Sequence, residues 1–190
     1  MMKEAFVLID GGYLSKISKH FGNGKYINID INQFANTLAK SQGLWCKGVY
    51  FYIAPPFQSD PPKKEETIRK ANHDRFIAKL RKIPNFTVRE GRCQKINNDF
   101  KQKGVDTWLT MDLLTISKNK ETNTIVLLTC DTDFVPILNQ IKADGNEVIL
   151  FYYNDFQRHS KFSMSNHILT ACNKCILIEK EFFDKSLKIL

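Results

Sequence analysis

Short apolar runs and helix-like stretches alternate along the whole chain. Runs rich in apolar and β-branched residues, bounded by turn-forming residues, predict buried strands at residues 5–9, 47–53, 86–90, 124–130, 147–153 and 174–178. Apolar residues at helical spacing predict helices at residues 13–20, 30–40, 61–82, 105–117, 134–143 and 163–172. Strands that alternate with helices favour right-handed βαβ units around a mainly parallel sheet. We therefore predict one α/β domain over residues 1–190, with a polar connector at 91–103 and an amphipathic tail at the end.

Three aspartates follow directly after two of the predicted strands. Asp10 ends the first strand and precedes a pair of glycines, which we expect to form a tight turn. Asp131 and Asp133 come where the strand at 124–130 stops. The carboxyl ends of parallel strands meet at one edge of a sheet, and open α/β sheets bind their ligands at that edge. We therefore expect these carboxylates to lie close together.

The predicted helix at 105–117 contributes two more acids. At helical periodicity Asp112 shares one narrow stripe with the apolar residues Val105 and Leu109, and Asp106 lies at the edge of that stripe. An ionised carboxylate in a core-facing stripe costs on the order of several kcal/mol unless donors, cations or a metal compensate for it. Asp112 therefore needs a partner that the sequence does not identify.

Each acid also has a simpler interpretation. Asp10 can start a turn, the acids at 106, 131 and 133 can cap helices, and Asp112 can accept backbone hydrogen bonds from a buried loop. The joint pattern favours a shared cation, because crowded carboxylates repel one another unless a cation lies among them. Oxygen-rich sites of this kind suit Mg²⁺ or Mn²⁺.

The net charge of +8 is confined to one part of the chain. Residues 61–103 contain 13 Lys and Arg against 5 Asp and Glu, whereas the remainder has 15 of each. Such a segment is typical of a surface that faces a polyanion. A solvated helix face kept soluble by lysines explains the excess equally well.

Membrane and secretory signals are missing from the sequence. No apolar run approaches the roughly 20 residues that span a bilayer, and no signal-like segment precedes Asp10. The five cysteines are odd in number and scattered, so they do not form a disulfide framework. We therefore expect a cytoplasmic protein with no membrane partner.

Three blocks of sequence resemble a known family. Residues 9–14 (IDGGYL), 103–106 (KGVD) with 112–114 (DLL), and 129–136 (TCDTDFVP) closely resemble the NYN domain family of the PIN-like nuclease superfamily, and more narrowly its LabA-like branch. The resemblance implies a single NYN domain with a PIN-like, three-layer α/β/α sandwich and a metal-dependent ribonuclease-type site. It implies four acids that bind the metal and take part in catalysis, namely Asp10, Asp106, Asp131 and Asp133. It implies Asp112 as a further acid of the metal site.

Four positions depart from the usual pattern of the family. Thr129 and Thr132 stand where members often have serines, a change that keeps the hydroxyl, and Tyr13 stands where many have Asn. Asn173 occupies the place of a late Asp before the final strand, so the site would lose one negative charge.

Substrate contacts are expected around the acids. Lys103, close to Asp106 in sequence, is expected to bind a phosphate near the reaction centre, unless it is simply a solvated lysine before a helix. The substrate-binding set is completed by Thr129, Thr132 and Tyr13. Tyr13 or Trp108 could stack bases, although Trp108 fits a core position as well.

The predicted function is hydrolysis of RNA phosphodiester bonds at the aspartates, with Mg²⁺ or Mn²⁺ as cofactor and RNA, single-stranded RNA included, as partner. The main alternative is an NYN-fold RNA-binding or regulatory module with weak or no catalysis, which Asn173 favours. A phosphatase of the haloacid dehalogenase type is disfavoured, because its nucleophilic DxD pair belongs on the first strand, where Gly12 occupies the second position. A homodimer stays open, because the tail at 179–190 could pack on its own domain or on a second copy.

Overall fold

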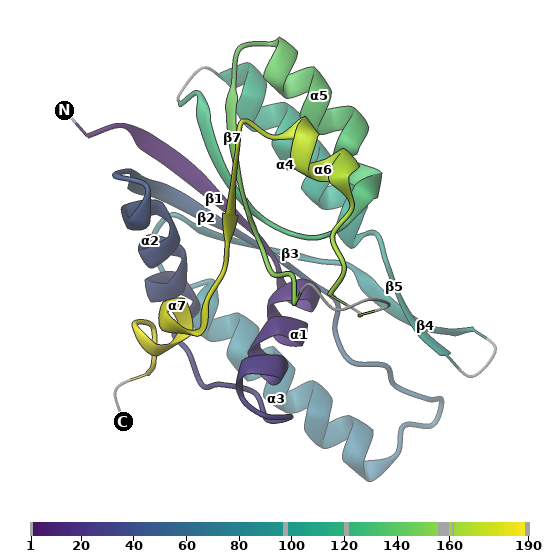
Figure 1. Cartoon of the computed structure of the whole chain (residues 1–190). Helices are drawn as coiled ribbons and strands as arrows, with labels where there is room; N and C mark the ends of the chain where they lie inside the picture. The colour runs from purple at the N-terminus through teal and green to yellow at the C-terminus, as the bar shows by residue number, and fades with distance from the viewer. Residues whose placement is uncertain (1, 97–98, 120–121, 156–159, 161, 189–190) are drawn as a thin grey trace.

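The computed structural model describes residues 2–96, 99–119, 122–155, 160 and 162–188. The centre of this part of the chain is a six-stranded sheet with the strand order β3-β2-β1-β6-β7-β8 (Figure 1). All neighbouring strands in it are parallel. Its members are β1 (Glu4–Asp10), β2 (Trp45–Ile53), β3 (Phe86–Glu90), β6 (Thr124–Leu128), β7 (Glu147–Tyr152) and β8 (Lys174–Leu177). The predicted α/β class and parallel central sheet are confirmed.

Helices cover both faces of this sheet (Figure 1). One face is covered by α1 (Gly11–Phe21), α2 (Ile31–Ser41), α3 (Lys64–Leu80) and α7 (Lys180–Asp184). The opposite face is covered by α4 (Val105–Asn119), α5 (Val135–Ala143) and α6 (Asn166–Ala171). The three-layer α/β/α sandwich implied by the resemblance is therefore the observed architecture.

The strands supply apolar side chains to both layers of helices. In β1, Val7 and Ile9 face one core and Leu8 faces the other. In β6, Val126 and Leu128 alternate with Ile125 and Leu127 in the same way, and all four are fully buried. Because successive side chains of a strand point to opposite faces, a strand covered on both sides needs a continuous apolar run.

The predicted polar connector is instead a β-hairpin. Its antiparallel strands β4 (Arg92–Ile96) and β5 (Asp99–Lys103) form a separate two-stranded sheet that projects from the body (Figure 1). The prediction was wrong because most residues on both faces of the hairpin are solvent-accessible, so its sequence carries no apolar alternation. One contact joins the hairpin to the loop after β2, since the rings of Phe57 and Phe100 lie 5.3 Å apart between centroids.

The two glycines after Asp10 begin helix α1 and do not form the predicted turn. The Asp10 side chain caps the helix, because its Oδ1 accepts a hydrogen bond from the backbone N–H of Tyr13 at 3.0 Å. A Cβ at Gly11 would lie 2.7 Å from the carbonyl oxygen of Tyr52 and 2.8 Å from the ring of Phe51. The helix can therefore start this close to β2 only with glycine at position 11.

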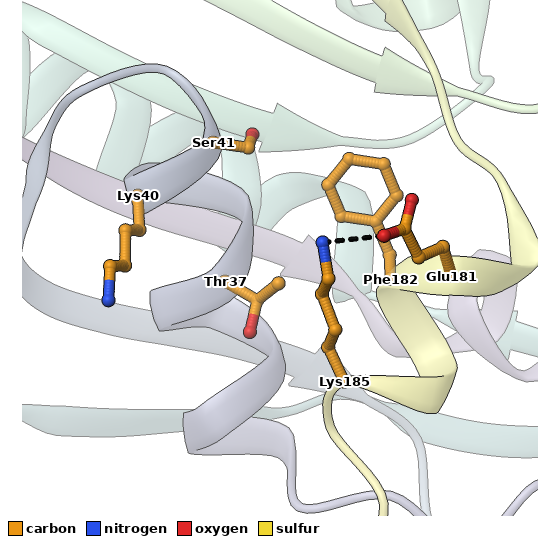
Figure 2. Close-up of a pocket in the computed structure, with 6 residues that line it drawn as sticks. All are labelled: Thr37, Lys40, Ser41, Glu181, Phe182 and Lys185. Carbon is orange, nitrogen blue, oxygen red and sulfur yellow. Dashed lines mark ion pairs between the residues drawn. The ribbon is translucent and has the colours of Figure 1, made fainter.

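The C-terminal tail packs on its own domain. Phe183 of α7 is fully buried, with its ring 5.1 Å from that of Phe34 and 5.4 Å from that of Phe21. Beside α7 lies a hollow of about 390 Å³. Its lining includes Lys185 and Glu181, whose ion pair of 2.7 Å is the dashed line in Figure 2. None of the candidate acids lines this hollow, whose lining residues are Thr37, Lys40, Ser41, Glu181, Phe182 and Lys185.

Gly11→Ala should lower the free energy of unfolding by about 1–3 kcal/mol, because the added methyl group overpacks the contact between α1 and β2. Urea denaturation followed by circular dichroism measures the change. Gly12→Ala is the matched control, since its nearest atom would be Asp10 Oδ1 at 3.2 Å and alanine favours a helix. Equal losses in the two variants would contradict the role given to Gly11.

Candidate metal-binding and catalytic site

The candidate site lies at the ends of two neighbouring strands whose following helices cover opposite faces of the sheet. Strands β1 and β6 are neighbours, but β1 leads into α1 on one face and β6 leads into α5 on the other. Such a change of face marks the switch point of an open α/β sheet, where the crevice at the carboxyl ends of the strands is the usual ligand site. Asp10 is the last residue of β1, and Asp131 follows the end of β6 at Leu128.

Asp10 is held at this edge by backbone and side-chain contacts. Its Oδ1 receives the cap hydrogen bond from Tyr13, and its Oδ2 lies 3.5 Å from the hydroxyl of Thr129. Burial raises the pKa of Asp10, and the nearby charge of Asp106 raises it further. Backbone N–H groups and Lys16 lower that pKa in part. The carboxyl group is therefore fixed in place but costly to ionise without a further cation.

Thr129 connects the acids of the two strands. This threonine is fully buried, and its hydroxyl accepts the backbone N–H of Asp131 at 3.3 Å while facing Asp10 at 3.5 Å. Asp131 in turn caps the short 3-10 helix η1 (Thr132–Phe134), because its Oδ1 accepts the N–H of Asp133 at 2.9 Å. Thr129, predicted to contact substrate, instead positions Asp10 and Asp131. Thr132 and Asp133 are exposed.

Asp106 reaches the same crevice from the first turn of α4. Partial burial raises its pKa, and the charges of Asp131 and Asp133 raise it further. Each of the four acids thus interacts electrostatically with at least one other, because Asp106 also acts on Asp10. The carboxylates from β1, α4 and the end of β6 are therefore near enough to act on one another electrostatically, and their convergence on one cation stays a prediction.

Asp112 does not join this cluster. Its Oδ1 accepts Nη2 of Arg89 at 2.8 Å, and its Oδ2 accepts Nε of Arg89 at 2.9 Å and the hydroxyl of Tyr52 at 3.1 Å. The carboxylate is therefore neutralised by a bidentate guanidinium from β3, which also lies 4.8 Å over the ring of Trp108. The expectation that Asp112 binds the metal is corrected, since both of its oxygens already have strong partners.

Tyr13 is a core residue and cannot stack a base. Its side chain is buried, and its hydroxyl accepts the N–H of Tyr153 at 2.8 Å and donates to the carbonyl of the same residue at 3.3 Å. The predicted substrate contact is therefore corrected, because Tyr13 joins α1 to the chain after β7 by these hydrogen bonds.

Trp108 is 37% exposed and has Arg89 over one face of its ring. Lys103 is exposed at the end of β5, with Gly104 between it and α4.

A family comparison decides where this chain belongs. The family model of the NYN domain matches residues 4–179. The chain belongs to the NYN domain family. This assignment also supports the PIN-like superfamily, whereas the LabA-like branch stays a prediction.

The fold of this NYN domain has also been seen in a solved structure. A protein of unknown function from Vibrio parahaemolyticus is 15% identical in sequence, and the alignment covers 98% of each chain with a TM-score of 0.61. At this identity the likeness concerns the fold alone. A search of curated proteins gives no match.

The candidate donors of the NYN domain are carboxylate oxygens, which suit a divalent cation that keeps several of its waters. Within the described ranges, no three His, Cys, Asp or Glu side chains form a ready-made metal site. Mg²⁺ seldom needs one, because proteins usually bind it through one or two carboxylates together with waters and substrate phosphates. The cap hydrogen bonds engage Oδ1 of Asp10 and Oδ1 of Asp131. Oδ2 of Asp10 has only the long contact of 3.5 Å with the hydroxyl of Thr129, so the Oδ2 atoms keep lone pairs for such a role.

Asn173 lies at the opposite edge of the sheet from these acids. Its Oδ1 accepts the N–H of Val148 at the start of β7, whereas the candidate site is at the strands' carboxyl ends. The expectation that Asn173 removes a charge from the site is therefore wrong. Asp155, which sequence reasoning missed, follows the carboxyl end of β7 and accepts a hydrogen bond from Ser160. The signal was present, because Asp155 comes two residues after the predicted strand at 147–153.

None of the helices in the described ranges is long and apolar enough to cross a membrane. All five cysteines are described, and all are free thiols.

Asp106→Asn should raise the free energy of unfolding of the metal-free domain at pH 7, because it removes one of the mutually repelling charges. The folded-state pKa of Asp106 is raised above its ordinary value of 3.8, so its ionisation costs stability above the folded-state pKa. The gain should therefore shrink to nothing as the pH falls through about 4. Urea denaturation at several pH values measures it, with the exposed Asp184→Asn as control. A gain that is as large at pH 3.5 as at pH 7 would count against the crowding of charges.

Asp112→Asn should lower the free energy of unfolding by about 2–4 kcal/mol, because Arg89 loses its counter-ion and Tyr52 keeps a weaker acceptor. A double-mutant cycle with Arg89→Met measures the coupling between the two side chains. The folded variant should still be stabilised by Mn²⁺ as much as the wild type is. Loss of that Mn²⁺ response would return Asp112 to the metal-binding set.

Proposed function

We propose that this NYN domain, as a LabA-like member of its family, is a ribonuclease that hydrolyses RNA phosphodiester bonds with Mg²⁺ or Mn²⁺. The observation that carries the proposal is the crowding of carboxylates from β1, α4 and the end of β6 at the crevice between β1 and β6. Membership in a family of nuclease-like domains supports it.

Each acid has a distinct task in this proposal. Asp10 and Asp131 would hold the cation directly, because their positions are fixed by caps and by Thr129. Asp106 and Asp133 would hold it directly or through water. The bound ion would supply the positive charge that activates water and stabilises the negative charge developing on the phosphate. Without that charge the carboxylates would repel an incoming phosphodiester.

The basic segment at 61–103 would bind the phosphates on either side of the cleaved bond. The structure distributes this segment over α3, β3 and the hairpin, which leads directly into α4 and Asp106. Some of its cations are already neutralised, because Arg89 pairs with Asp112 and Arg81 with Glu90. The exposed cations of the hairpin are the stronger candidates for phosphate contacts: Arg92, Lys95, Lys101 and Lys103. Lys103 stays the expected contact nearest to the acids, and Thr132 stays a proposed substrate contact.

A cytoplasmic location is part of the proposal. Five free thiols suit a reducing compartment, where disulfides are rare and RNA is abundant.

The second candidate is an RNA-binding module of the same fold without turnover. It is favoured by the lack, in the described part of the chain, of a group of three acids ready to hold a metal. Both candidates predict RNA binding, so only cleavage separates them.

Asp131→Asn should reduce single-turnover cleavage of a mixed-sequence RNA in Mn²⁺ by roughly 100-fold or more, because it replaces a charged ligand with a neutral one. Gel analysis of end-labelled RNA measures the rate. Asp184→Asn, at an exposed position on α7, is the matched control and should cleave like the wild type.

A metal titration gives a second readout that does not depend on cleavage. Mn²⁺ should raise the melting temperature of the wild type by mass action and have a much smaller effect on Asp131→Asn. RNA binding without cleavage by either protein, and without a Mn²⁺ response, would establish the binding module in place of the nuclease.

A further inference from the structure

Two hollows adjoin the exposed face of helix α1, and the same two lysines line both. The first, of about 350 Å³, is bordered by Gly11, Gly12, Lys16, Lys19 and Gln102 among others. The second, of about 440 Å³, is lined by Lys16, Lys19, His20, Gly24 and Phe162. Lys16 and Lys19 are exposed and three residues apart on one helix, so their side chains emerge from the same face.

The first hollow opens beside Asp10, because Gly12 lines the hollow and lies next to the carboxyl group of Asp10. A Cβ at Gly12 would lie 3.2 Å from Oδ1 of Asp10 and 3.7 Å from Oε1 of Gln102, so Gly12 forms a low floor between the acid and the hairpin. The charge of Lys16 lies near enough to lower the pKa of Asp10. An RNA backbone that runs from Asp10 past Gly12 would therefore reach Lys16 before Lys19.

The two lysines lack carboxylate partners in the described part of the chain. None of the ion pairs there includes Lys16 or Lys19. The ammonium group of Lys19 lies 5.9 Å from the ring centroid of Tyr26, which is itself 68% exposed. Two unpaired cations beside a crowded set of carboxylates are placed to bind an anion that also approaches those carboxylates.

The second hollow adds aromatic walls to this basic rim. The rings of His20 and Phe162 lie 4.8 Å apart between centroids, and His20 Nε2 lies 2.8 Å from the hydroxyl of Tyr153. Cations that follow a backbone and rings that receive bases are the combination by which proteins bind single-stranded nucleic acid. In a duplex the bases are stacked on one another and are not offered to such rings.

We propose that Lys16 and Lys19 bind two successive phosphates of a single-stranded RNA as it passes from the acids, while a base enters the hollow walled by His20 and Phe162. The two lysines lie on α1, outside residues 61–103, so they form a second basic flank across the first hollow from Gln102 of the hairpin. The inference rests on the proposed function, because it takes Asp10 as the reaction centre. It adds a binding surface on α1 and names the side chains that would hold the single strand there.

The test measures RNA binding in EDTA, where no cleavage occurs. Fluorescence anisotropy of a labelled, mixed-sequence single-stranded RNA gives the binding constant at several salt concentrations. The double variant Lys16→Gln/Lys19→Gln should bind at least about tenfold more weakly and lower the salt slope by about 1.4, as expected for two lost contacts to a single strand. Lys40→Gln is the matched control, because Lys40 is an exposed helical lysine beside the separate hollow of Figure 2.

Two further comparisons address strandedness and the aromatic wall. A duplex of the same sequence should bind more weakly than the single strand, and its affinity should not respond to the double substitution. Phe162→Ala should weaken binding of the single strand while leaving the salt slope unchanged, because it removes a ring and no charge. Thermal melting shows whether each variant is folded.

The outcomes separate this inference from the proposed function. Unchanged affinity and salt slope in the folded double variant would overturn the inference, even if the wild type cleaves RNA. Equal loss of binding for duplex and single strand would overturn the assignment to single-stranded RNA. If the double variant loses binding but the wild type never cleaves, the binding surface stands and the ribonuclease proposal fails.

Discussion

Repulsion between carboxylates is the constraint on which the candidate site depends. The adjacency of β1 and β6 places Asp10 and Asp131 at one crevice, and the start of α4 adds Asp106. Burial is the main cause that raises the pKa values of Asp10 and Asp106, and the charges of the neighbouring acids raise them further. The fold can bear the free-energy cost of these neighbouring charges, because the sheet is packed on both faces and its strand ends are held in place. Backbone amides at the helix starts further fix Asp10 and Asp131.

One partly buried ion pair stabilises the fold itself. Asp112 and Arg89 join α4 to β3 through two hydrogen bonds, and the hydroxyl of Tyr52 on β2 completes the arrangement. Because Asp106 lies on the same helix, this junction sets where its carboxylate reaches the crevice. Two acids of one helix thus have different tasks: one contributes to the candidate site, and the other fixes the helix that carries it.

The sequence predicted the sheet and the main acids well because both depend on local patterns. Strands buried on both faces need continuous apolar runs, and Asp10 and Asp131 follow directly after two of them. The partner of Asp112 was not predictable, because Arg89 is 23 residues away and the intervening hairpin has no apolar alternation. The core position of Tyr13 depends on a hydrogen bond to a residue 140 positions away. Lys16 and Lys19 could have been found from helical spacing after Asp10, but they lie outside the segment that holds the charge excess.

The hairpin is attached to the domain in a way that makes it separable. Its first and last residues, Arg92 and Lys103, are paired with each other, and Gly91 and Gly104 flank it. A Cβ at Gly91 would lie 2.5 Å from the carbonyl oxygen of Lys103, so the base of the hairpin is tightly closed. The paired residues at the base of the hairpin therefore connect β3 to α4, whatever the length of the hairpin beyond them. A hairpin of another length, or with other charged residues, would therefore change what such a domain recognises without altering the sheet or moving the acids.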